Sequence, residues 1–250
     1  FDFLYFCIIM LTKTRALVLR TVKYGESKLI ADLLTEEIGR VGIVANIPQS
    51  SRGRAARAFF QPLTLLDIEI DYRQTMQLQK YRNVSNLLPY TSLTMNPVKT
   101  CIVMFLSEFL YHVTRDEQQN HALFSYIVNS LEWLDAKEDS FANFHLVFMM
   151  RLAKFIGFSP NLEGYCEGCY FDLRSGCFET GLPCHGAIVL PDEARAILTL
   201  TRMNYENMHL FSMSRTERNR CMDVVLKYYT IHVPNFPELK SLEVLRSLFS

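Results

Sequence analysis

The spacing of apolar residues changes near Pro97, and this change divides the chain into a β-rich part and a helical part. Between Leu63 and Tyr72, apolar and acidic residues alternate one by one. A period of two is typical of a strand with one face in a core and the other in water. After Pro97, apolar residues recur at three- and four-residue spacing, which indicates amphipathic helices. The first of these apolar series comprises Cys101, Ile102, Phe105, Phe109 and Val113.

The part before Pro97 contains five segments with strand character. Turn-forming residues separate them, among them Tyr24-Gly25-Glu26-Ser27. Five short strands with regularly spaced turns predict a small closed barrel of the OB type. The five segments are residues 16–22, 29–34, 40–45, 63–72 and 76–84.

The part after Pro97 is predicted to be helical over residues 98–113, 121–134 and 141–158. Ser214 and Glu217 have the spacing of a capping box, so a further helix should run to about Val233. A last short helix is expected over 239–249. We therefore predict an α+β protein. Its expected parts are a non-native or loose apolar extension at 1–9, for which packing on the body is the alternative, an OB-fold domain at 10–87, and an α-helical domain at 88–250.

Basic residues are concentrated in the β-rich part, although the chain as a whole is neutral. Residues 10–61 carry nine basic and four acidic side chains. Such a local excess predicts a surface for a polyanion, because phosphates attract clustered Lys and Arg whatever the base sequence. The alternative is a charge cluster that only solvates the surface. The candidate nucleic-acid-binding residues are Arg20, Lys23, Lys28, Arg40, Arg52, Arg54 and Arg57.

The last three of these arginines lie in a segment from Ile47 to Arg57 that we expect to be a basic loop. Tyr24, Phe59 and Phe60 lie near the basic residues and are candidates for stacking on bases. For Phe59 and Phe60 individually, a place in the core is the favoured interpretation.

Four of the seven cysteines fall in one short window, which predicts a metal-binding insertion at about residues 160–190. Cys166 and Cys169 form a Cys-x-x-Cys pair, whose thiolates have the spacing that a tetrahedral zinc ion needs. The second half is irregular, because six residues separate Cys177 from Cys184. One structural zinc ion held by these four thiolates is one hypothesis, and a reduced, metal-free loop is the other.

No motif in the chain indicates an enzyme. The phosphate-binding loop of NTPases, the dinucleotide-binding Gly-x-Gly-x-x-Gly, the His-Glu-x-x-His zinc motif and the Gly-x-Ser-x-Gly elbow are all absent. The acidic row Asp67, Glu69 and Asp71 is interpreted as the solvated face of a strand. No segment reaches the roughly 20 apolar residues of a membrane helix, and cysteines without a secretory signal indicate a reducing compartment. We therefore expect a binding protein outside the membrane.

Several short segments, taken in order, resemble the RecO family of bacterial recombination mediators. They are residues 18–21, 24–27, 34–36, 39–40 and 239–245, and the match extends over almost the whole chain from Met10. The resemblance implies an OB barrel followed by a helical domain with a zinc-finger-like insertion. Full metal sites of this family have two Cys-x-x-Cys pairs, whereas this chain has one.

The resemblance also implies a role. It suggests a non-catalytic, cytoplasmic and nucleoid-associated protein of DNA repair that binds single- and double-stranded DNA and anneals complementary strands. Its expected partners are RecR and the C-terminal tail of the single-strand-binding protein, with which it helps to load RecA. A competing hypothesis is a protein interaction module, in which the helical domain binds a partner tail and the barrel serves as a scaffold.

Overall fold

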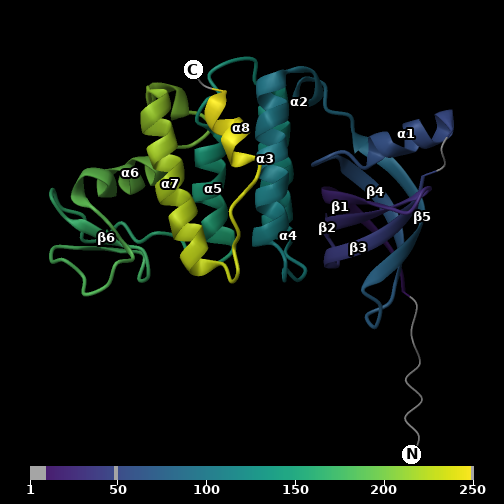
Figure 1. The fold of residues 1–250 in the computed structure, drawn as a ribbon, viewed down its shortest axis with the longest axis horizontal. Coiled ribbons are helices and arrows are strands. Elements are labelled where there is room, and N and C mark those ends of the chain that lie inside the picture. Colours follow the sequence, from purple (N-terminus) through teal and green to yellow (C-terminus); the bar gives the residue numbers. More distant parts are fainter. Residues whose placement is uncertain (1–9, 48–49, 249–250) are drawn as a thin grey trace, which may run out of the picture. The chain divides into compact units, whose positions relative to one another are not determined.

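The computed structural model describes residues 10–47 and 50–248, with the backbone alone at residues 51, 52, 54 and 55. The expected extension at 1–9 lies outside the described residues. The chain divides into two compact units, one ending at residue 128 and the other beginning at residue 129. Figure 1 shows that strands dominate the early part of the chain and helices the rest, which confirms the α+β fold class.

Five strands form a closed barrel in the first unit. They follow one another in space as β1-β2-β3-β5-β4, and the β3–β5 pairing is parallel whereas the others are antiparallel. This closed five-stranded sheet confirms the predicted OB-type barrel. The strands are β1 (Met10–Tyr24), β2 (Lys28–Thr35), β3 (Gly39–Asn46), β4 (Leu65–Tyr72) and β5 (Leu78–Leu88).

The barrel closes through β1, which is long enough to pair with two neighbours. Residues 10–17 pair with β4, and residues 16–24 pair with β2. A β-bulge between Val18 and Arg20 lies just beyond the point where the strand exchanges one partner for the other. Because a bulge bends a strand and increases its twist, it lets β1 serve both sides of the barrel.

The alternation in β4 has the predicted consequence. Leu66, Ile68 and Ile70 are at most 1% exposed in the barrel core. On the outer face, the acidic residues have cross-strand partners: Asn83 donates a hydrogen bond to Glu69 over 2.6 Å. Asp67 and Asp71 form ion pairs with Lys13 and Arg82 at 3.3 and 2.8 Å.

The expected basic loop is instead a helix, α1 (Ser51–Phe59). The Ser50 hydroxyl accepts a hydrogen bond from the Gly53 amide over 3.4 Å and thereby caps the helix. Three alanines within the segment favour a helix, and Phe59 and Phe60 pack against the barrel core. The prediction of a loop was wrong because it gave weight to Gly53 and the charges, whereas the apolar end of the segment has a core to bury itself in.

A long helix, α3 (Pro97–Val113), packs on the barrel after the short α2 (Ser92–Met95). The Asn96 side chain caps it by accepting from two backbone amides. Inside the contact, the buried Ser107 hydroxyl donates to the carbonyl of Leu19 over 2.6 Å. Leu19 lies in the bulge of β1 and has no partner residue in the β1–β2 pairing. Its carbonyl is satisfied instead by the Ser107 hydroxyl of α3.

The turn between β2 and β3 makes a close contact with the segment that follows α3. The Arg40 amide donates to the Glu117 carbonyl over 3.0 Å. Gly39 has a φ of +82°, and a Cβ at this position would lie 2.5 Å from the same carbonyl oxygen. Both the backbone conformation and the space therefore require glycine at residue 39.

The second unit combines helices with a small sheet. Helix α4 (His121–Ala136) contains the boundary between the units. The later helices are α5 (Phe144–Phe155), α6 (Pro191–Arg202), α7 (Arg215–His232) and α8 (Leu242–Ser247), with one 3-10 turn, η1 (Met208–Leu210). No helix in residues 10–47 and 50–248 is both long enough and apolar enough to cross a membrane.

The small sheet has the order β7-β6-β8 and falls inside the predicted insertion. Its strands are β6 (Tyr170–Asp172), β7 (Cys177–Glu179) and β8 (Ile188–Val189). The predicted capping box is confirmed, since Ser214 and Glu217 each accept a hydrogen bond from the other's backbone amide. The sequence reading missed α6, although Pro191 followed by two acidic residues is typical of a helix start.

A buried polar cluster fixes the segment between α6 and α7 against α5. The Asn143 amide donates to the carbonyls of Met208 and Phe211 over 3.3 and 2.9 Å, and it accepts from Arg218 Nε over 3.0 Å. His145 is buried beside this cluster on α5. Burial and the positive charge of Arg218 together lower the pKa of His145 to about 3.

We expect Gly39→Ala to destabilise the first unit more than Gly25→Ala. Both glycines have positive φ, which costs an alanine about 1–2 kcal/mol, but a Cβ at Gly25 would have nothing within 4 Å. The collision at Gly39 should add about 1–3 kcal/mol. Urea unfolding followed by far-ultraviolet circular dichroism measures both variants, and equal losses would contradict the close contact.

We expect acid to destabilise the second unit through His145. Its folded pKa lies below the unfolded value of 6.5, so below pH 6.5 the unfolded chain binds a proton that the folded chain excludes. Stability should fall by about 2 kcal/mol between pH 7 and pH 5 from this group. Unfolding followed by the fluorescence of Trp133, the single tryptophan, should show a smaller loss over that range in His145→Gln. An unchanged loss in the variant would assign the effect to other groups.

Candidate nucleic-acid interface

Two of the basic residues in the barrel segment are neutralised by acids. Lys13 Nζ lies 3.3 Å from a carboxylate oxygen of Asp67. Arg15 donates two hydrogen bonds to Glu36, over 2.7 and 2.6 Å. These side chains contribute to the charge count of the sequence, but their charge is locally balanced.

Arg40 also has partners of its own. Its guanidinium donates to the Tyr111 carbonyl and the Thr114 hydroxyl over 3.1 and 3.3 Å, and it lies 3.6 Å from Asp32. It stacks on the Tyr111 ring at 4.5 Å, and only 12% of the side chain is exposed, so burial lowers the pKa of Arg40. This side chain holds α3 against the barrel, and its predicted contact with phosphate stays a prediction.

Arg20 shares the same aromatic ring but remains at the surface. Its guanidinium carbon lies 4.9 Å from the centre of the Tyr111 ring, and the residue is exposed. An arginine that stacks on a ring keeps its outward edge available for hydrogen bonds. Arg20 is therefore positioned for a phosphate in a way that Arg40 is not.

Three of the predicted cations come together around one pocket. Lys23 and Lys28 lie on either side of the β1–β2 turn, at the end of one strand and the start of the next. Arg57 lies in the last turn of α1. All three line a pocket of about 260 Å³. Within the part of the chain that the structure describes, none of the three forms an ion pair with a carboxylate.

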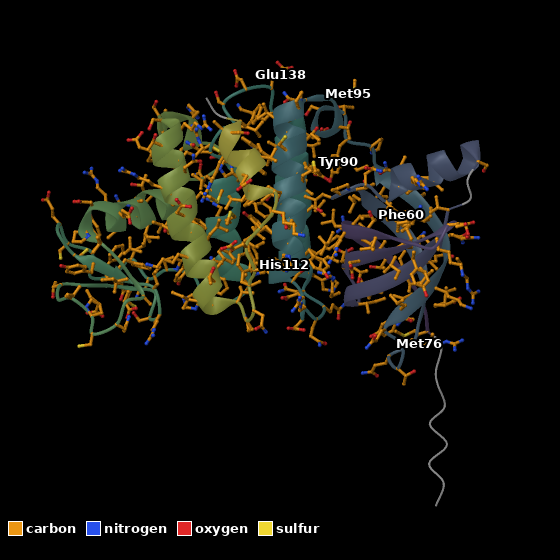
Figure 2. The ribbon with its side chains drawn as sticks, viewed as in Figure 1. Phe60, Met76, Tyr90, Met95, His112 and Glu138 are labelled. Carbon is orange, nitrogen blue, oxygen red and sulfur yellow. The ribbon has the colours of Figure 1, made fainter. Side chains whose placement is uncertain are left out.

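The floor of this pocket is apolar. Leu29, Ile47 and Phe60 line it, and they are 9%, 2% and 2% exposed. Phe60 lies between α1 and the strands (Figure 2) and makes an edge-to-face contact with Tyr81 at 6.2 Å. The pocket thus combines a rigid apolar base with a positively charged rim. Sequence reasoning identified the rim and, in Phe60, one residue of the floor. It missed Leu29 and Ile47, because the floor residues come from separate segments.

The structure describes the side chains of the candidate stacking residues Tyr24 and Phe60 but not those of Arg52 and Arg54. Arg52 and Arg54 belong to α1, but their side chains lie outside the described residues, so their contact with DNA stays a prediction. Among the candidate stacking residues, Tyr24 is 57% exposed at the β1–β2 turn, whereas Phe60 is buried as expected. Tyr24 is therefore the accessible ring nearest to Lys23 and Lys28 in sequence.

A second hollow lies in the other unit, along α6. It has a volume of about 810 Å³ and is lined by one face of that helix together with Tyr165, Glu167, Gly168 and Phe211. Asp192 lies in the first turn of α6 and Arg202 in the last, with Arg195 between them. Along α6, the negative charge therefore lies in the first turn and the positive charge toward the C-terminal end, and Glu167 adds a second carboxylate to the lining.

The four cysteines do not gather into one site. Cys166 and Cys169 share a tight turn in which the Cys169 amide donates to the Cys166 carbonyl over 3.2 Å. Desolvation and the neighbouring Cys169 thiol raise the pKa of Cys166. The Cys177 thiol instead donates to the Ser175 carbonyl over 3.5 Å, and Cys184 is exposed. Among the described residues, no three His, Cys, Asp or Glu side chains are grouped to hold a metal ion. The four thiols as the structure places them do not form a tetrahedral zinc site, and whether the protein binds one zinc ion remains an untested prediction.

Two family models match the chain in succession. The model described as Recombination protein O N terminal matches residues 10–90. The model described as Recombination protein O C terminal matches residues 96–243. The two matches together span the barrel, the small sheet and the helices α1 and α3 to α7.

Curated relatives are similar to the chain along their full length. A DNA repair protein RecO of Phocaeicola vulgatus is 46% identical over 241 residues, and one of Azobacteroides pseudotrichonymphae is 36% identical over 240 residues. A third, of Flavobacterium psychrophilum, is 32% identical over 243 residues. Each alignment covers 96% of this chain and 100% of the relative. On these matches, the chain belongs to the RecO family.

Proposed function

We propose that this protein is a DNA-binding recombination mediator and that its DNA-binding surface is centred on the pocket of Lys23, Lys28 and Arg57. Membership of the RecO family supports a role in DNA repair and recombination. The observation that supports the surface is that three exposed cations, none of which forms an ion pair with a described carboxylate, line one pocket of an OB-type barrel domain. Barrels of this type commonly bind single strands with such a combination of charge and apolar surface.

The proposed contacts are mainly electrostatic. Lysine and arginine side chains neutralise phosphates and release bound counterions, so binding to single- and double-stranded DNA needs no particular base sequence. A surface that neutralises two backbones at once lowers their mutual repulsion, and base pairing between the strands then supplies the specificity. Strand annealing follows from this property. The proposed role is binding without catalysis, because the sequence holds none of the enzyme motifs considered above.

The salt dependence of binding tests this surface. We expect Lys23→Ala/Lys28→Ala/Arg57→Ala to weaken the binding of single-stranded DNA and to reduce the slope of log affinity against log salt by about 2, because each lost phosphate contact on a single strand contributes about 0.7. Fluorescence anisotropy with a labelled oligonucleotide at several salt concentrations measures both quantities.

A matched control removes cations that already have acid partners. Lys13→Ala/Arg82→Ala takes two positive charges from the same barrel, but Asp67 and Asp71 neutralise these charges in the native protein. We expect this variant to keep most of the affinity and the slope. If both variants changed the slope alike, the net charge of the barrel rather than the pocket would be responsible.

A second candidate function is the binding of a partner tail in the α6 groove, and the presence of two arginines and two aromatic rings in the lining of that groove supports it. The tail of the single-strand-binding protein, which the family resemblance suggests, would place its terminal carboxylate on Arg195 or Arg202 and its apolar residues against Tyr165 and Phe211. Arginine is well suited to bind a carboxylate with two parallel hydrogen bonds. Cooperation with RecR and loading of RecA belong to the same proposal and rest on the resemblance.

We expect Arg195→Glu/Arg202→Glu to weaken the binding of a peptide with the C-terminal sequence of the single-strand-binding protein by about tenfold or more, since charge-assisted hydrogen bonds are lost and repulsion replaces them. Isothermal titration calorimetry measures the affinity. Arg174→Glu/Arg220→Glu makes the same charge change at exposed residues outside the groove and should leave it unchanged. Equal affinity of all three proteins would remove the groove from the interface.

A further inference from the structure

The pocket between the β1–β2 turn and the end of α1 has features that phosphate binding alone does not require. Phosphates need cations at a surface, whereas this site also encloses an apolar floor of Leu29, Ile47 and Phe60. We propose that the pocket receives one unstacked nucleotide of a single strand, with the base against the apolar floor and the adjoining phosphates on Lys23, Lys28 and Arg57. This inference rests on the proposed DNA-binding function and adds a base-binding subsite to it.

The size of the pocket agrees with one nucleotide. Its volume is about 260 Å³, just below the range of about 300–1,000 Å³ that holds drug-sized ligands. A single base with part of its sugar is of this order, whereas a stack of bases is larger. The site therefore suits one base that has left its neighbours.

The floor is held in place by the barrel itself. Phe60 and Ile47 pack within the core cluster of the barrel, and Phe60 contacts the Tyr81 ring edge to face. A base that enters the pocket meets a preformed apolar surface and pays little to order it. Contact between a base and such a surface does not depend on base identity, since every base has an apolar face.

The rim supplies the polar contacts that a nucleotide needs. Gln61 and Thr21 line the pocket at exposed positions, and the Gln61 amide donates to the Arg57 carbonyl over 3.1 Å, which orients the side chain. Amide and hydroxyl groups of this kind can bond to the edge of a base. The three cations lie around the same opening, where the phosphates on either side of the inserted base would pass.

A subsite for one unstacked base favours single-stranded over double-stranded DNA. A paired base is stacked on both faces and must be unstacked and unpaired before it can enter, at a cost of a few kcal/mol. An unpaired base enters without the pairing cost. The subsite should therefore add affinity for single strands, while phosphate contacts at the rim remain available to both kinds of DNA.

The experiment compares oligothymidylate with a strand of equal length and equal phosphate number in which abasic sites replace the bases. At each salt concentration, the wild-type protein should bind the natural strand about fivefold or more tightly, because stacking contributes about 1–3 kcal/mol per base. Val22→Trp and Gln61→Trp place a large ring at exposed pocket-lining positions. Both should lower this ratio at least threefold and leave the salt slope unchanged.

Leu11→Trp is the matched control, because it adds the same ring to an exposed position of β1 that does not line the pocket. It should keep the wild-type ratio. A wild-type ratio near one, with a steep salt slope, would overturn the base subsite and leave the phosphate surface intact. A ratio that both pocket variants retain would overturn it as well. If neither strand bound at low salt, both the subsite and the proposed DNA-binding function would be overturned.

Discussion

The structure of the first unit depends on the double pairing of β1. One strand that pairs with β4 over its first half and with β2 over its second half closes the sheet into a barrel. The bulge that permits this also turns the Leu19 carbonyl to Ser107 of α3. Beyond the bulge, the strand continues to Lys23, which lines the pocket. The closure of the barrel, the attachment of α3 and the position of Lys23 therefore all depend on β1.

The charge excess of the segment separates into two groups with different tasks. Arg15 and Arg40 are held by acids and aromatic rings, so they connect structural elements. Lys23, Lys28 and Arg57 have no such partners in the described chain and surround a cavity. A buried or paired cation gains little from a phosphate, because it must first give up the contacts that it already has. The number of basic residues in the sequence therefore overstates the binding surface.

The features that could be predicted from the sequence are those that depend on the spacing of apolar residues or on interactions between residues close in the chain. Alternation in β4 and the capping box of α7 depend on neighbouring residues, and both were confirmed. The basic segment was assigned to a loop because its helix depends on a distant core for Phe59 and Phe60. The pocket could not be predicted for a similar reason, since Leu29, Ile47 and Phe60 meet only after the barrel has closed. For the cysteines, the spacing predicted one regular Cys-x-x-Cys pair and an irregular second half. Among the described residues, no three of these side chains are grouped as ligands, because spacing in sequence does not determine where separate turns lie in the fold.

Neutrality of the whole chain constrains how such a surface can work. A protein without net charge has little long-range attraction for DNA, and at physiological salt the field of a few cations extends only about 8 Å. The binding free energy must then come from short-range contacts, where nearby cations and a desolvated apolar surface act together. Contact between a base and the apolar floor does not weaken as salt is added, whereas the electrostatic attraction of the rim for phosphates does. If the proposed base subsite exists, a pocket with both features would let a neutral protein hold a strand at physiological salt and release it when pairing with a second strand offers the base a better environment.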